Sequence, residues 1–204
     1  DTPAPADPFD AVLRTPRELF LFDAQASAFR PVKVRGQITY SDAGKLFLQA
    51  DGMGLKLLPD GACEARPGDL VEAVGYPNIR RTELVLRAAL IKRTGTAPLP
   101  PPLPIVDSPR AGHSLHATRV RVDGKLLGWH TEEGGPVLEM QSGNRLYLAR
   151  VTTTEAVTLS LRPGSRLALE GVYVGRGYTL SPEPDSESFE LLLNSLADIT
   201  VLAK

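Results

Sequence analysis

The sequence is poor in cysteine, aromatic side chains and long apolar runs. Cys63 is the single cysteine among 204 residues, so no disulfide can form within the chain. No apolar stretch approaches the roughly 20 residues that a membrane-spanning helix requires. Aromatic residues make up 6% of the chain, and 23 basic residues face 24 acidic ones. Because phosphate contacts usually require a basic excess, this balance argues against nucleic acid as a partner.

Glycine and proline are abundant instead, at 18 residues each, and several of them occupy equivalent positions in an internal repeat. RPGDLVEAVGY spans residues 66–76, and RPGSRLALEGVYV spans residues 162–174. Each Pro-Gly pair suits a type II turn, in which glycine takes the positive φ. The alternating small and apolar residues that follow predict a strand. The second glycine of each copy, Gly75 or Gly171, suits a bend where a small sheet curls over itself.

The repeat extends upstream and predicts the fold class. VKVRG at residues 32–36 matches VRVDG at 120–124, and each copy then has a predicted hairpin, with turns at 51–54 and 142–144. ELVLRAALIKR and FELLLNSLADITVLAK supply a last strand for each copy. A three-stranded meander, a loop and two further strands is the order of the OB-fold. We therefore predict an all-β chain of two tandem five-stranded OB-fold-like barrels; tandem β-sandwiches would need more strands per repeat.

Four domain segments follow from these patterns. Residues 1–30 form an N-terminal segment, residues 31–96 the first barrel, residues 97–106 a proline-rich linker and residues 107–204 the second barrel. Thr15 and Glu18 form a capping box, which predicts a helix over about residues 16–26 with Leu19, Phe20 and Phe22 against the first barrel. The second copy has eight extra residues before its Pro-Gly turn, where Thr154 would cap a short helix over residues 155–159.

Several segments of the first copy also match a known family. PVKVRGQITY, LFLQADGMGLKL, RPGDLVEAVGY and LRAALIKRTGTAPLP resemble the extracytoplasmic sensor region of bacterial two-component sensor histidine kinases, which has tandem OB-fold-like domains. The resemblance implies a periplasmic location and a role as the input region of a signalling kinase. The chain itself has no signal peptide at its start, so we expect contact with a membrane only through segments outside it.

Candidate binding residues of the first barrel come from its loops. OB-folds commonly bind ligands across their second and third strands and between their first and fourth loops. SDAGK and PNIRRT occupy those loops here, which places Tyr40, Lys45, Tyr76, Arg80 and Arg81 at one predicted rim. Two arginines and a stacking ring suit an anionic ligand or a short nucleic-acid strand. The alternative is that Arg80 and Arg81 form a solvated hairpin tip.

The corresponding loops of the second barrel carry Trp129, His130, Arg176 and Tyr178 beside several acidic residues. Rings next to carboxylates suit a sugar or a cationic ligand. The acidic residues are Glu132, Glu133, Glu183, Asp185 and Glu187, and they lack the spacing of a calcium loop. The three histidines lack a zinc-binding pattern. We therefore expect no metal ion and no cofactor.

No catalytic signature is present: the sequence has no nucleophile elbow, no P-loop and no dinucleotide-binding glycine pattern after a strand. We therefore expect no catalytic residues and a non-enzymatic function. The leading hypothesis is an extracytoplasmic sensor, ligand-binding or protein-interaction module for an unknown small molecule, glycan or protein. The two alternatives are an OB-fold oligonucleotide-binding protein and a carbohydrate-binding accessory domain.

Overall fold

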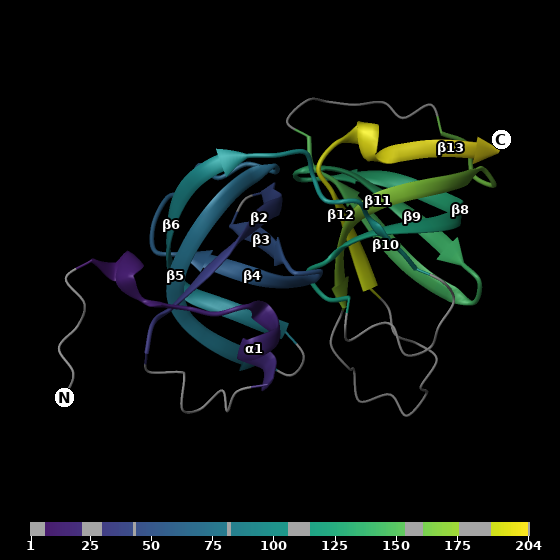
Figure 1. Cartoon of the computed structure of the whole chain (residues 1–204). Coiled ribbons are helices and arrows are strands. Elements are labelled where there is room, and N and C mark those ends of the chain that lie inside the picture. The colour runs from purple at the N-terminus through teal and green to yellow at the C-terminus, as the bar shows by residue number, and fades with distance from the viewer. Residues whose placement is uncertain are drawn as a thin grey trace. The chain divides into compact units, whose positions relative to one another are not determined.

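The structure is a computed structural model that describes residues 7–21, 30–42, 44–80, 83–105, 115–153, 161–175 and 189–203. The chain divides into two compact units, Asp1–Pro100 and Pro101–Lys204. Each unit contains a closed five-stranded mixed β-barrel, which confirms the predicted all-β fold of two tandem OB-fold-like barrels (Figure 1). No helix within the described ranges is long and apolar enough to cross a membrane.

The first barrel consists of β2 (Val32–Asp42), β3 (Lys45–Ala50), β4 (Met53–Pro59), β5 (Asp69–Arg80) and β6 (Glu83–Thr96). β2, β3 and β4 form an antiparallel meander. β4 then pairs in parallel with β6, and β5 pairs antiparallel with both β6 and β2. These pairings close the barrel. A two-residue strand, β1 (Val12–Leu13), adds in parallel to the outer edge of β2.

The second barrel repeats this path. It consists of β8 (Arg119–Glu132), β9 (Gly135–Ser142), β10 (Arg145–Val151), β11 (Arg166–Gly175) and β12 (Phe189–Leu193), followed by β13 (Ile199–Ala203). The predicted continuous last strand is wrong, because a 3₁₀ turn, η2 (Leu196–Asp198), separates β12 from β13, and both strands pair with β11. Ser195 and Asp198 cap this turn reciprocally, which is what interrupts the strand.

The repeated Pro-Gly turns form as predicted. Gly68 and Gly164 have φ values of 98° and 96°, which glycine adopts without a steric penalty. The Gly68 N–H donates to the Ile38 carbonyl at 2.8 Å, and the Gly164 N–H donates to the Leu126 carbonyl at the same distance. Each turn therefore fastens the start of the fourth barrel strand to the first barrel strand.

The closing glycines lie where two strands cross closely. A Cβ atom added to Gly75 would lie 2.6 Å from the Arg87 carbonyl oxygen, and one added to Gly171 would lie 2.5 Å from the Leu192 carbonyl oxygen. Any side chain at these positions would push the strands apart. The apolar residues that alternate with these glycines face the two cores, and Val71, Ala73, Leu167 and Leu169 are all buried.

The N-terminal helix α1 (Pro16–Leu21) starts at the predicted capping box. The Thr15 N–H donates to Glu18 Oε2 at 2.7 Å, and the Glu18 N–H donates to Thr15 Oγ1 at 3.2 Å. Leu19 is part of the first core, and Phe20 packs against it. Before this helix lies a short 3₁₀ turn, η1 (Pro8–Asp10). Phe22, the rest of the predicted helix to residue 26, and the predicted helix at 155–159 lie outside the described residues.

Both ends of the proline-rich linker are hydrogen-bonded to barrels. Gln37 Nε2 donates to the carbonyls of Ala97 and Pro98 at 2.7 and 3.0 Å. At the other end, β7 (Leu103–Pro104) pairs in parallel with β8, and the Ile105 N–H donates to the Arg121 carbonyl. Part of the predicted spacer is thus a strand of the second unit, and residues 99–102 lie between the two attachments.

Candidate functional site

An exposed row of side chains crosses four strands of the first barrel. The buried residues Leu46, Leu57 and Leu86 pair in register across β3, β4 and β6, and Leu86 pairs with Pro77 on β5. Because side chains alternate along a strand, their sequence neighbours face outward. These neighbours, which we call the exposed row, are Lys45, Leu58, Arg87 and Tyr76, and all four are exposed.

Tyr76 and Arg87 are directly paired in the antiparallel ladder between β5 and β6. The Tyr76 side chain is 39% exposed, whereas the other three tyrosines that the structure describes are 2–3% exposed. The Arg87 side chain is exposed and has no hydrogen bond or ion pair within the described part of the chain. An uncompensated guanidinium thus lies beside an accessible phenol ring.

A distortion of the ladder produces this pairing. The register between β5 and β6 shifts between Val74 and Tyr76. Ala88, the residue after Arg87, has a φ of 47°, in the left-handed region that non-glycine residues rarely adopt. Such a conformation costs about 1–2 kcal/mol. Strained non-glycine residues of this kind cluster at functional sites.

Of the other predicted residues of the first barrel, the structure places only Lys45 in the exposed row. Tyr40 is 2% exposed, and its ring lies 6.2 Å from that of Phe47, so its face is not offered to a ligand. Lys45 is exposed at the start of β3 and belongs to the exposed row. Arg80 ends β5, but its side chain and the whole of Arg81 lie outside the described residues. Loop-based reasoning missed Arg87 and Leu58, which the outward alternation of β6 and β4 identifies.

Of the predicted residues of the second barrel, His130 belongs to a network with an excess of carboxylates. Trp129 packs partly buried against the core. His130 Nε2 lies 2.9 Å from Glu132 Oε1, and Glu132 also bonds Arg150. These hydrogen bonds, His130 first and then Arg150, hold the pKa of Glu132 below its ordinary value. The carboxylates of Glu139 and Glu190 complete the network, so this face is a poor match for phosphate.

Two further predictions concern Arg176 with Tyr178 and the absence of a metal ion. Arg176 and Tyr178 lie outside the described residues. Within the described ranges, no group of three or more histidine, cysteine, aspartate or glutamate side chains is arranged to hold a metal ion.

Comparisons with known proteins give structural neighbours only. No protein-family model matches the chain, and no curated protein matches it. A solved structure described as a murine DNA-binding protein bound with double-stranded DNA is 8% identical, with a TM-score of 0.37 over 84% of this chain and 96% of that chain. The p202 HIN1 domain in complex with a 12-mer double-stranded DNA is 8% identical, with a TM-score of 0.35 over 86% and 92% of the two chains. The tetrameric p202 HIN2 domain is 10% identical, with a TM-score of 0.31 over 85% and 93%.

These comparisons correct three expectations from the sequence. The resemblance to the sensor region of histidine kinases is wrong, because no such family or protein matches and two of the similar structures are p202 HIN domains. The interpretation of the chain as a sensor or protein-interaction module depended on this resemblance and is therefore wrong as well. The expectation against a nucleic-acid partner is contradicted as well: two of these structures are described as bound to double-stranded DNA. The periplasmic location stays an untested prediction.

Proposed function

We propose that this chain is a non-enzymatic nucleic-acid-binding protein, and that the exposed row of its first barrel contacts the unpaired bases of a single strand. The observation that carries the proposal is the pairing of an accessible tyrosine, Tyr76, with an uncompensated arginine, Arg87. An aromatic ring stacks on any base, and an adjacent arginine binds the phosphate that follows it.

The rest of the exposed row extends this contact. Lys45 lies three strands away from Tyr76 across β4 and β6, or roughly 14 Å at the usual strand spacing of about 4.8 Å. Leu58, which is 37% exposed, lies between Lys45 and Arg87. The row thus presents two cations, one ring and one apolar side chain, with no carboxylate among its members. The whole chain has nearly equal numbers of basic and acidic residues, but the binding of an anion depends on the electrostatic potential at the binding surface.

The internal repeat supports a specific role for this pair. Tyr76 pairs with Arg87 beside Gly75, and in the second barrel Val172 pairs with Leu192 beside Gly171. Val172 and Leu192 are each 1% exposed. The two copies share the backbone arrangement, so the barrel does not require an exposed tyrosine or a charge at this point. The first copy has both.

A fluorescence titration with a single-stranded oligonucleotide carrying 2-aminopurine tests the proposal on the full chain. We expect binding at low salt with quenching of the probe, since stacking on Tyr76 brings the base against a ring. Tyr76→Ala should weaken binding about tenfold and abolish the quenching, because stacking contributes about 1–3 kcal/mol per base. Tyr76→Phe should keep both, because it keeps the ring.

Leu90→Ala is the matched control, because Leu90 is an exposed residue of the same hairpin, at 38%, and it is not part of the exposed row. It should bind like the unmodified protein. Absence of single-strand binding, or unchanged quenching with Tyr76→Ala, would overturn the proposed function.

A further inference from the structure

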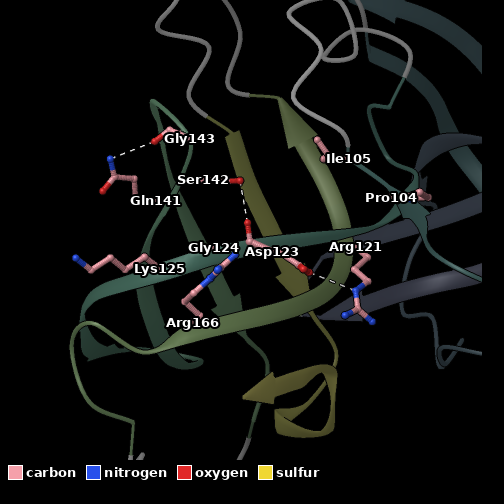
Figure 2. Close-up of a pocket in the computed structure, with 10 residues that line it drawn as sticks. All are labelled: Pro104, Ile105, Arg121, Asp123, Gly124, Lys125, Gln141, Ser142, Gly143 and Arg166. Carbon is pink, nitrogen blue, oxygen red and sulfur yellow. Dashed lines mark hydrogen bonds and ion pairs between the residues drawn. The ribbon is translucent and has the colours of Figure 1, made fainter. Parts of the chain in front are cut away.

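A hollow of about 650 Å³ lies on the second barrel, away from the carboxylate network described above. It is formed by the first half of β8, the end of β9, the start of β11, and Pro104 of β7 with Ile105 after it (Figure 2). Its charged lining residues within the described ranges are Arg121, Asp123, Lys125 and Arg166. Three cations against one carboxylate make the hollow basic.

The cations of the hollow differ in how they are compensated. Arg121 Nε lies 3.3 Å from Asp123 Oδ1, and Arg121 Nη1 lies 3.9 Å from Glu170 Oε1. Lys125 and Arg166 are both exposed, and neither has a hydrogen bond or ion pair within the described residues. Figure 2 accordingly draws an interaction for Arg121 and none for Lys125 or Arg166.

Lys125 and Arg166 are also direct partners in the antiparallel ladder between β8 and β11. Like charges placed directly opposite each other destabilise a sheet. Two unpaired cations in this arrangement therefore lower the stability of the free protein, and an anion bound between them would remove the repulsion.

The first barrel shows that the fold does not require this arrangement. Gln37 pairs with Leu70 there, at the register that Lys125 and Arg166 occupy beside Gly124. The Gln37 side chain is engaged with the carbonyls of Gly68, Ala97 and Pro98. A hollow of about 520 Å³ is present in the first barrel as well, but its one arginine, Arg35, bonds Glu72 at 2.7 Å. Only the second copy has uncompensated cations at these positions.

We propose that the basic hollow of the second barrel is a phosphate site, in which Lys125 and Arg166 together bind a phosphodiester of a nucleic-acid backbone. Arginine provides a planar fork of donors for two phosphate oxygens, and lysine adds a compact charge. Among the residues that the structure describes, no aromatic side chain lines the hollow, so they provide no platform for a base. The site therefore contacts the phosphate backbone and not the bases, and it accepts double-stranded as well as single-stranded nucleic acid.

This inference rests on the proposed function for the source of the phosphate, but it concerns a separate surface. The exposed row requires an unstacked base, whereas the basic hollow requires only the backbone. Binding of a blunt duplex therefore reports on the hollow, and binding of a single strand reports on both sites.

Fluorescence anisotropy of the full chain with a labelled blunt duplex, repeated over a series of salt concentrations, tests the hollow. Lys125→Gln combined with Arg166→Leu installs the residues of the first barrel. We expect this variant to weaken duplex binding at least tenfold. The slope of log K against log salt should fall in magnitude by about 1, because the two residues share one phosphate contact and each such contact contributes about 0.9.

Arg17→Gln combined with Arg30→Gln is the matched control. It removes the same charge from two exposed arginines of the first unit and should bind duplex normally. Urea denaturation at low salt should find the hollow variant at least as stable as the unmodified protein, because repulsion is removed. Loss of binding then cannot be ascribed to unfolding.

The remaining outcomes separate this inference from the proposed function. If the chain does not bind duplex, or if the hollow variant binds it normally, the phosphate site is overturned, while single-strand quenching by Tyr76 would still support the proposed function. If inorganic phosphate perturbs the Lys125 and Arg166 NMR signals but duplex does not, the ligand is a small phosphate and the backbone assignment is wrong.

Discussion

At the scale of single residues, Tyr147 shows how an aromatic core can hold a polar atom without a partner. Its ring stacks on Phe189, with centroids 4.5 Å apart, while its hydroxyl is buried and has no hydrogen-bond partner among the described residues. Burial, and secondarily the charge of Asp123, raises the pKa of this hydroxyl well above that of an ordinary tyrosine. The hydroxyl also limits its neighbour: a Cβ added to Gly124 would lie 2.9 Å from it.

Tyr147→Phe should therefore be neutral or stabilise the fold by up to about 1 kcal/mol, because it removes a buried group that gains no hydrogen bond. Tyr147→Leu should instead destabilise it by roughly 1–3 kcal/mol, because the stacked ring is lost. Urea unfolding of the two variants provides the measurement. A clear loss of stability with Tyr147→Phe would show that the hydroxyl has a bonding role.

At the scale of elements, the capping box of α1 gives a dependence on pH. The hydrogen bond from the Thr15 backbone to the Glu18 carboxylate holds the pKa of Glu18 below its ordinary value. An acid with a lowered folded-state pKa stabilises the fold above its unfolded pKa, and this contribution disappears as pH falls through the lowered value. Glu18→Gln should therefore be less stable than the unmodified chain at neutral pH. The two melting temperatures should converge in acid; a constant gap would contradict the argument.

The sequence predicted elements correctly where single residues have strong backbone preferences. It failed where the secondary structure depends on pairing with a distant strand or on a cap within a strand-like run. The Pro-Gly turns, the hairpins and the capping box follow from residues with strict backbone preferences. β7 could not be predicted, because it has two residues, one of them Pro104, and forms only by pairing with β8. The break between β12 and β13 comes from Ser195 and Asp198, which cap a turn within a run that otherwise reads as one strand.

At the scale of the whole molecule, the sequence predicted that the barrel is duplicated, but it did not predict how the surfaces of the two barrels differ. Each barrel has a point where two strands cross closely, and only glycine fits there. Gly75 and Gly171 therefore identify the two barrels in the sequence. The pairing of Lys125 with Arg166 joins residues that are distant in sequence, and the pairing of Tyr76 with Arg87 depends on a register shift within a hairpin. Reasoning from loops therefore proposed Tyr76 with Arg80 and Arg81, but it overlooked Arg87, the strand partner of Tyr76, and the pair formed by Lys125 and Arg166.

The boundary of the second unit leads to a last prediction. Residues 101–204 include β7 and Ile105, which packs partly buried against the second core, whereas residues 107–204 lack both. We expect the longer fragment to fold with a cooperative transition. The shorter one should be less stable by about 1–2 kcal/mol, since it loses the burial of an isoleucine and the strand pairing to Val120 and Arg121. Because Pro104 and Ile105 also line the basic hollow, the shorter fragment should bind duplex more weakly even where both are fully folded. Equal stability and equal binding would show that the linker contributes to neither.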